Sequence, residues 1–195
     1  PQPNEINSLC RKPFLRPNVV QGPYSGWEHY LDVQYRLLRE DFIGPLRSGI
    51  CSFYNNERYS DIRVYENVHV TEPVCLLSGL GFQLKFNTQQ LQKVQWEHSK
   101  RLIYGSLLCL SHDDFHNIIF VSVVKQEPAM LAQGSAIVKF EGTLNNSVLN
   151  PDTEYVMVES TAYFEAYRHI LEGLQKLEPA RMPFQKYIIS CSVQR

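Results

Sequence analysis

The stretch Ser25–Gly49 decides the expected fold; its sequence is S-G-W-E-H-Y-L-D-V-Q-Y-R-L-L-R-E-D-F-I-G-P-L-R-S-G. Apolar side chains recur in it at intervals of three and four residues, which is the spacing of one face of an α-helix. These side chains are Trp27, Tyr30, Leu31, Tyr35, Leu38 and Phe42. Ser25 and Glu28 have the spacing of a capping box, and Gly44-Pro45 predicts a stop, or a kink before a short extra turn. A long helix with so wide an apolar face needs a partner in water.

The partner is expected far downstream, where Ser160 and Thr161 can cap a second helix and Pro179 closes it. Its apolar residues follow the same helical spacing and are Tyr163, Phe164, Tyr167, Ile170, Leu171, Leu174 and Leu177. We expect its length to be similar to that of the first helix and the two to pack antiparallel. The side chains predicted to meet are Leu31, Leu38 and Phe42 from the first helix and Tyr167, Leu171 and Leu174 from the second.

Between the two helices the pattern changes to that of β-strands. The segments expected to form about six short strands are 61–70, 74–86, 101–111, 117–125, 136–141 and 154–159. Gly79 and Gly81 predict a tight turn, a bulge or a barrel bend, and His112–His116 predicts the turn of a hairpin. Because closure removes exposed sheet edges, the expected fold class is α+β, mainly β: a small antiparallel β-barrel inserted between two long antiparallel stalk helices.

The expected organisation has five parts. They are an extended lead-in at 1–24, stalk helix one at 25–54, the β-barrel at 55–159, stalk helix two at 160–178 and an exit segment at 179–195. Within the exit segment, Phe184–Val193 is apolar and predicts a further strand. The chain begins at Pro1 rather than at Met, so we expect it to be processed or cut from a longer protein.

The composition indicates a globular protein with a real core, because 44% of the residues are hydrophobic and 12% aromatic. A net charge of −1 implies no general surface for binding polyanions. The five cysteines form no C-x-x-C pair and are odd in number, which favours reduced thiols over a disulfide framework or a zinc ribbon. Cys75 and Cys109 lie in apolar runs and are expected in the core. No apolar run is long enough to predict a membrane span.

Catalytic motifs are missing from the sequence: it has no P-loop, no dinucleotide-binding glycine pattern, no H-E-x-x-H and no nucleophile elbow. We therefore predict no catalytic residue, no metal ligand and no cofactor within this chain. The cluster His112–His116 contains two histidines and two aspartates, which could suit zinc, but a polar hairpin turn is the favoured interpretation.

Gln92–Arg101, with the sequence Q-K-V-Q-W-E-H-S-K-R, is the stretch that favours nucleic-acid binding. An aromatic ring for base stacking lies here among cations that can neutralise phosphates. The candidate nucleic-acid-binding residues are Lys93, Trp96, Lys100 and Arg101. The competing interpretation is a solvated loop with Trp96 tucked into the barrel.

Four blocks of sequence carry a resemblance to a known family. They are H-Y-L-D-V-Q-Y-R-L-L-R-E-D-F-I-G-P-L-R-S-G-I at 29–50, W-E-H-S-K-R-L-I-Y-G-S-L-L-C-L-S at 96–111, M-V-E-S-T-A-Y-F-E-A-Y-R-H-I-L-E-G-L-Q at 157–175 and P-F-Q-K-Y-I at 183–188. In this order they closely resemble the large RNA helicases that carry NFX-type zinc fingers. The match runs from about Lys12 to Ile189. In that family the region looks like the stalk and β-barrel that precede the ATP-binding core of an Upf-like superfamily-one helicase.

The resemblance implies a parent that is an ATP-dependent RNA helicase, associated with RNA surveillance, antiviral sensing of double-stranded RNA in innate immunity, and small-RNA inheritance. It also implies cytoplasmic work, in RNA granules or at the mitochondrial surface. ATP and Mg would bind the parent's core and Zn its zinc fingers, and this chain has the motifs of neither.

For the chain itself the resemblance implies an accessory module that positions RNA, single- or double-stranded, against the motor and regulates it. Its partner would be the helicase core of the same chain. The alternative is a protein-interaction or regulatory module without RNA contact of its own, which the near-neutral charge favours. A free-standing enzyme ranks third, because no set of residues meets the geometric roles of an active site.

Overall fold

The computed structural model describes residue 6 and residues 13–77, 79–141 and 149–192. The chain divides into two compact units. The barrel unit comprises residues 1–9 and 45–164, and the helical unit comprises residues 10–44 and 165–195. Within the described residues, none of the helices combines the length and the apolar character that crossing a membrane requires.

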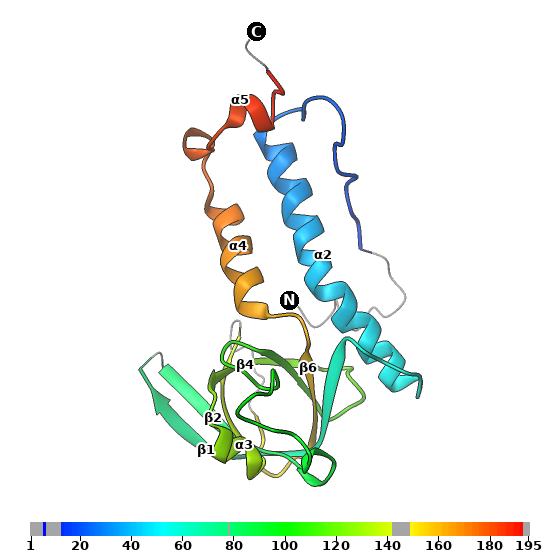
Figure 1. The fold of residues 1–195 in the computed structure, drawn as a ribbon, viewed down its shortest axis with the longest axis vertical. Coiled ribbons are helices and arrows are strands. Elements are labelled where there is room, and N and C mark those ends of the chain that lie inside the picture. The colour runs from blue at the N-terminus through cyan, green and yellow to red at the C-terminus, as the bar shows by residue number, and fades with distance from the viewer. Residues whose placement is uncertain (1–5, 7–12, 78, 142–148, 193–195) are drawn as a thin grey trace. The chain divides into compact units, whose positions relative to one another are not determined.

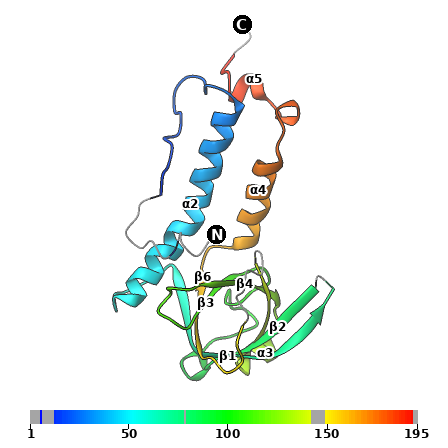
Figure 2. The same cartoon turned by 180° about the vertical axis from the view of Figure 1, so that it is seen from behind.

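Six strands form a closed antiparallel barrel in the order β1-β2-β5-β4-β3-β6, and its closure is visible from both sides (Figures 1 and 2). The strands are β1 Ile62–Leu76, β2 Gly79–Lys85, β3 Leu107–Ser111, β4 Ile119–Lys125, β5 Ser135–Phe140 and β6 Tyr155–Ser160. The predicted mainly-β fold with a small antiparallel barrel is therefore confirmed.

The long strand β1 closes the barrel because it serves two neighbours in turn. Its first part, Ile62–Val68, pairs with β6, and its second part, His69–Leu76, pairs with β2. The pairing register shifts on both sides of this change of partner, as at a β-bulge, which bends a strand and increases its twist. Asn67 lies in the first irregularity with φ 53°, a left-handed conformation that asparagine tolerates better than most residues.

The apolar segment predicted at 74–86 is in fact two antiparallel strands joined by a turn. Gly79 begins β2 with φ 120°, a conformation that favours glycine. At Gly81 a Cβ atom would lie 2.5 Å from Cδ1 of Leu76 and 2.9 Å from the backbone oxygen of Val138, so the close approach of β5 to β2 favours glycine there. The prediction that Cys75 lies in the core is wrong, because this residue is exposed where the β1–β2 ribbon extends past the β6 pairing.

The barrel interior is a single hydrophobic cluster. Its buried members are Tyr65, Val68, Val70, Leu84, Phe86, Trp96, Leu102, Leu108, Leu110, Val121, Val123, Leu131, Ala136, Val138, Leu149, Tyr155 and Met157. Cys109 is also buried, as predicted, and the loss of solvation raises the pKa of its thiol to about 12.

Two short helical elements interrupt the strands and were not predicted. The 3-10 turn η1, Gln89–Leu91, follows β2, and the helix α3, Pro128–Ala132, joins β4 to β5. Proline at the first helical position starts α3 without losing a hydrogen bond, and Leu131 places its side chain in the core.

Helix α2 runs from Trp27 to Tyr54 without ending at Pro45, so of the two predicted alternatives the stop is wrong, and the extra turn belongs to the same helix. The helix continues because Leu46 and Ile50, beyond the proline, are fully buried. At Gly49 a Cβ atom would lie 2.5 Å from a methyl group of Ile62, so the last turns pack directly on β1. Here tertiary burial outweighs the local cost of proline.

The capping box predicted at the start of α2 is wrong. The helix begins at Trp27, so Ser25 stands before the cap position. Its hydroxyl oxygen lies 2.9 Å from Nδ1 of His29, and the carbonyl of Gly26 accepts the first hydrogen bond of the helix from the N–H of Tyr30.

Helix α4 comprises Phe164–Lys176, and all of it after Phe164 belongs to the helical unit. It runs beside the first part of α2, and both views show the two helices side by side (Figures 1 and 2). The hydroxyl of Tyr167 donates to Asp41 at 2.6 Å, and the amide of Gln175 donates to the hydroxyl of Tyr35 at 2.9 Å. As residue numbers rise along α4 they fall along α2, so the helices are antiparallel. The ring of Tyr167 also lies 5.1 Å from that of Phe42.

The second helix differs from its prediction in length, cap and burial. It has 13 residues against 28 for α2. Ser160 ends β6 rather than capping the helix, and the hydroxyl of Thr161 donates to the carbonyl of Asp61. Among the side chains predicted to meet, only Phe42 is buried, and the others are half-buried; these are Leu31, Leu38, Tyr167, Leu171 and Leu174.

The strand predicted at 184–193 is also wrong, because α5, Gln185–Ile188, is a short helix that follows the 3-10 turn η2, Pro179–Arg181. Val193 lies outside the described residues. The end of α5 contacts the lead-in: the N–H of Tyr24 donates to the carbonyl of Ile189 at 2.9 Å.

Candidate nucleic-acid interface

The polar stretch predicted to bind nucleic acid, Gln92–Arg101, connects η1 to the segment before β3. It contains turns rather than strand or helix, and two backbone hydrogen bonds close them: Val94 N–H to the carbonyl of Leu91 and His98 N–H to the carbonyl of Gln95. The stretch therefore lies on the barrel unit as an irregular connection whose side chains take different directions.

Trp96 is buried, with 8% of its surface exposed, and belongs to the barrel core. Its ring centroid lies 6.4 Å from that of Phe86. A base needs an open aromatic face for stacking, and a core position offers none. The stacking role expected of Trp96 is therefore corrected: the ring fills the barrel, as the competing interpretation held, because burying a large apolar surface is favourable.

Arg101 is half-buried and is directed at the barrel rather than wholly at solvent. Its guanidinium carbon lies 6.0 Å above the ring of Tyr65, and one of its nitrogens donates to the hydroxyl of Tyr65 at 3.4 Å. Part of the charge that the sequence assigned to phosphate binding is thus used in a contact with the barrel wall.

A buried carboxylate, that of Glu159 on β6, holds the end of this stretch. It accepts hydrogen bonds from the hydroxyl of Tyr65 at 2.8 Å and from the N–H of Leu102 at 2.7 Å. Arg63 on β1 completes the network: its guanidinium lies 3.2 Å from Glu159 and donates to the carbonyl of Lys100 at 2.7 Å. Two strands therefore fix the backbone that carries Lys100.

The hydroxyl of Tyr65 is the protonated partner in its hydrogen bond with Glu159. Burial and the neighbouring negative charge of Glu159 both raise the pKa of the Tyr65 hydroxyl, so it stays protonated and donates to the carboxylate. Sequence reasoning missed this network. The signal that could have found it is a carboxylate inside the apolar run of β6, which burial leaves in need of a cation such as Arg63.

Lys93 and Lys100 are the two predicted residues with exposed side chains. Lys100 is displayed on the backbone that Arg63 and Glu159 hold, and Lys93 follows η1. Of the four candidates, then, two lysines face solvent, Arg101 is shared with Tyr65, and Trp96 is internal. The binding of RNA by the lysines stays a prediction.

The segment His112–His116 forms the turn of the β3–β4 hairpin. Asp113 organises it by accepting hydrogen bonds from the side chain of Ser111 and from the backbone of Asn117, each at 2.9 Å. Burial tends to raise the pKa of Asp113, but the hydrogen bonds from Asn117 and Ser111 outweigh it and lower the pKa. Within the part of the chain that the structure describes, no group of three or more histidine, cysteine and acidic residues could hold a metal ion.

The architecture defines a class: a six-stranded antiparallel barrel formed by the chain that lies between two helices in sequence. The family follows from comparison, because a family profile described as the ZNFX1 domain matches residues 57–161. The chain belongs to the ZNFX1-domain family.

Named relatives extend the match to nearly the whole chain. NFX1-type zinc finger-containing protein 1 is 41% identical to it in Mus musculus and 40% in Homo sapiens, in each case over 98% of this chain and 10% of the relative. The "Helicase required for RNAi-mediated heterochromatin assembly 1" of Schizosaccharomyces pombe is 36% identical over 91% of this chain and 18% of the relative. These relatives confirm the predicted resemblance to zinc-finger helicases. The chain spans about a tenth of the length of the mammalian relatives.

Proposed function

We propose that this chain is an accessory module of an ATP-dependent RNA helicase, in which the barrel positions RNA and the two helices form a stalk that transmits regulation to the motor. The observation that carries the proposal is the match over nine-tenths of the chain to a fission-yeast protein whose name states that it is a helicase. The family membership supports it, as does the antiparallel contact of α2 with α4.

The proposal assigns the chemistry of the parent to its other parts. ATP and Mg belong to the helicase core, Zn to the zinc fingers, and the partners of this module are RNA and the core of the same chain. Action in antiviral defence, innate immunity and RNA surveillance, in cytoplasmic granules or at the mitochondrial surface, belongs to the same proposal and comes from the resemblance.

RNA contact is proposed to centre on Lys93 and Lys100. Both are exposed, and the backbone of Lys100 is held by Arg63. Two phosphate contacts to a single strand give a salt slope of only about −1.4, so binding by the module alone is weak near physiological salt. Joining this patch to the RNA channel of the motor raises its effective concentration and makes weak contacts useful.

The test is a salt titration of single-stranded RNA binding by the chain and by Lys93→Glu/Lys100→Glu. We expect the double variant to bind more weakly at low salt, with a slope flatter by about 1.4. Lys176→Glu/Lys186→Glu is the matched control, since it reverses the same charge at two exposed lysines of the helical unit. If the two double variants lose equal RNA affinity, the loss comes from the change in net charge, and Lys93 and Lys100 are not a specific RNA contact.

A second candidate function, docking of a partner protein, is favoured by the β1–β2 ribbon. Past Val68 the strand β1 pairs with β2 and no longer with β6. On this ribbon Leu77 is fully exposed and Leu80 is 56% exposed, so two large apolar side chains that are close in sequence face solvent together. Leu77→Ser/Leu80→Ser discriminates the two functions: it should leave RNA binding unchanged, and reduced helicase regulation in the longer protein would favour docking.

A further inference from the structure

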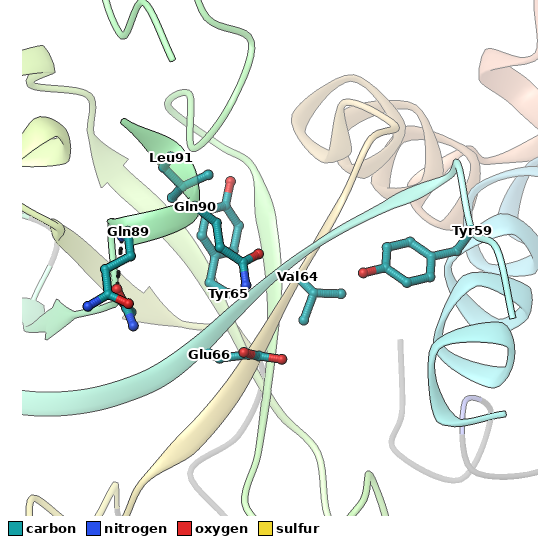
Figure 3. A pocket seen from close by; sticks show the side chains of 8 residues that line it. Tyr59, Val64, Tyr65, Glu66, Gln89, Gln90 and Leu91 are labelled. Carbon is teal, nitrogen blue, oxygen red and sulfur yellow. Dashed lines mark hydrogen bonds between the residues drawn. The ribbon is translucent and has the colours of Figure 1, made fainter. Parts of the chain in front are cut away.

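A small pocket lies in the barrel unit over the beginning of β1, with about 90 Å³ of interior space. Tyr59 borders it on one side of the strand and the η1 residues Gln89 and Gln90 on the other (Figure 3). Glu66 contributes a carboxylate from β1 itself, and Val64 and Leu91 add apolar surface. These residues come from three separate segments, so the pocket is a product of the fold that no sequence motif marks.

Several polar side chains around the pocket are available to form hydrogen bonds with a ligand. Within the described part of the chain, the phenol of Tyr59, the carboxylate of Glu66 and the side-chain amides of Gln89 and Gln90 have no hydrogen-bond partner. The position of η1 is nevertheless fixed, because Asn87 accepts a hydrogen bond from the N–H of Gln89 at 2.9 Å. Convergent unused donors and acceptors beside an apolar surface are the features of a ligand site.

The volume of the pocket and the charges of its lining residues limit the kinds of ligand that it can bind. About 90 Å³ is several times the roughly 10–15 Å³ that one water needs, yet far below the roughly 300 Å³ at which sites for whole cofactors begin. No lysine or arginine lines the pocket, so it is not built for a phosphate group. A flat, uncharged group with both donors and acceptors on its edge fits this lining.

An aromatic face and flanking cations point to the same ligand. The ring of Tyr59 is held edge-to-face by Phe53 at 5.8 Å and remains 42% exposed, which leaves surface for stacking. Arg58 precedes Tyr59, and Lys93 follows η1 by two residues; both are exposed. Proteins that read single-stranded RNA stack an unpaired base on an aromatic ring and bind its edge by hydrogen bonds, with cations at the phosphates.

We propose that this pocket binds one unpaired base of an RNA strand, an inference that rests on the proposed function and names the part of the strand that is read. The carboxylate of Glu66 can only accept, so it favours a base with an exocyclic amino group, namely guanine, cytosine or adenine, over uracil. The amide of Gln90 can donate to a ring nitrogen or carbonyl of the same base and accept from it.

The experiment measures the affinity of the whole chain for a fluorescent oligouridine and for the same strand with one central guanine, cytosine or adenine. We expect at least one substituted strand to bind about tenfold tighter than oligouridine, the discrimination that one good bidentate contact supplies. In Glu66→Gln/Gln90→Ala the substituted strands and oligouridine should bind with about equal affinity, and the affinity for oligouridine should be retained. Tyr59→Ala should weaken every strand and Tyr59→Phe none, because stacking needs the ring and not the hydroxyl.

Matched controls are Glu72→Gln and Gln133→Ala, both at exposed positions outside the pocket lining, which should keep the preference. Equal affinity of the unmodified chain for all strands, or a preference that survives Glu66→Gln/Gln90→Ala, would overturn the pocket inference and leave the proposed RNA function standing. Absence of any RNA binding would overturn both. NMR shifts of the Gln90 amide caused by a short peptide, and by no RNA strand, would assign the pocket to a protein segment and also overturn the inference.

Discussion

The barrel unit and the helical unit rest on different kinds of contact. The barrel closes on itself and surrounds one continuous apolar cluster in which Leu84, Leu108 and Leu110 have no exposed surface. In the helical unit α4 contacts α2 through hydrogen bonds between polar ends of side chains, such as Tyr167 to Asp41, and through the rings of Tyr167 and Phe42. The barrel therefore has the means to be stable through burial alone, whereas most of the side chains where the two helices meet are only half-buried.

Both units leave large apolar side chains in water, but the barrel unit, which exposes Leu77 and Leu80, also has its buried cluster. In the helical unit Ile170 is 54% exposed, Phe184 71% and Tyr187 56%. Side chains of this size left in water contribute little to stability, so the helical unit should open locally at a lower free energy than the barrel.

The largest effect is expected inside the barrel. Leu110→Ala removes a side chain with no exposed surface and leaves a cavity, which should lower the free energy of unfolding by about 3–5 kcal/mol. Urea denaturation of the whole chain measures it. Leu80→Ala is the control, because that leucine is 56% exposed and its loss should stay within about 0.5 kcal/mol. A loss below about 1 kcal/mol for Leu110→Ala would mean that the barrel core is as loosely packed as the helices.

Next comes the buried ion pair. Glu159→Gln keeps the size of the side chain but leaves Arg63 facing a neutral group, and we expect a loss of about 2–3 kcal/mol. The value is below that for a fully buried pair because 22% of the Arg63 side chain is exposed. Hydrogen exchange should quicken at Leu102, whose N–H donates to the carboxylate. Glu154→Gln, at a half-exposed carboxylate, is the control; equal protection of Leu102 in both variants would contradict a holding role for Glu159.

How far the sequence predicts this chain depends on whether a local pattern meets a tertiary competitor. The first strand was predictable from alternating apolar residues, β3 and β4 were predictable from apolar runs that are buried on both faces, and the β3–β4 turn was predictable because most of its residues are polar. The stop at Pro45 was wrong because burial of Leu46 and Ile50 outweighs a local helix-breaking pair. The core position predicted for Cys75 was wrong because an apolar run does not reveal that the β1–β2 ribbon extends past its pairing with β6.

The candidate site shows the same limit in another form. Lys93, Trp96, Lys100 and Arg101 are close in sequence, but side-chain direction separates them: Trp96 enters the core, and Arg101 contacts Tyr65. The partners that decide this, Glu159 and Tyr65, lie on other strands. Composition within ten residues can indicate an interface, whereas which side chains face solvent is set by contacts across the barrel.

A smaller effect is expected where α4 meets α2. Leu171 is only half-buried, so Leu171→Ala should lower the free energy of unfolding by roughly 1–2 kcal/mol, less than the leucine of the barrel core. Hydrogen exchange should quicken in α4 and leave β3 and β6 protected. Ile170→Ala, at the exposed neighbour, is the control and should change little. Faster exchange in the barrel strands on Leu171→Ala would contradict the separate stabilities of the two units.

The smallest effect concerns pH and belongs to the helical unit. Hydrogen bonds from Arg168 lower the pKa of Glu165 from its usual 4.5, burial opposes the shift, and the charges of Arg168 and His169 add to the lowering. A carboxyl whose pKa is depressed on folding stabilises the folded state above its unfolded pKa, and this contribution is lost as the pH falls through the folded-state value. Below about pH 4.5 the helical unit should therefore lose stability, by less than the substitutions above cost.

Fluorotryptophan labelling separates the two units, because Trp27 reports the helical unit and Trp96 the barrel. Between pH 5 and pH 3 the urea midpoint of the Trp27 signal should fall more in the unmodified chain than in Glu165→Gln, while Glu178→Gln should behave like the unmodified chain. An identical fall in all three would show that the Glu165–Arg168 pair adds nothing to the helical unit.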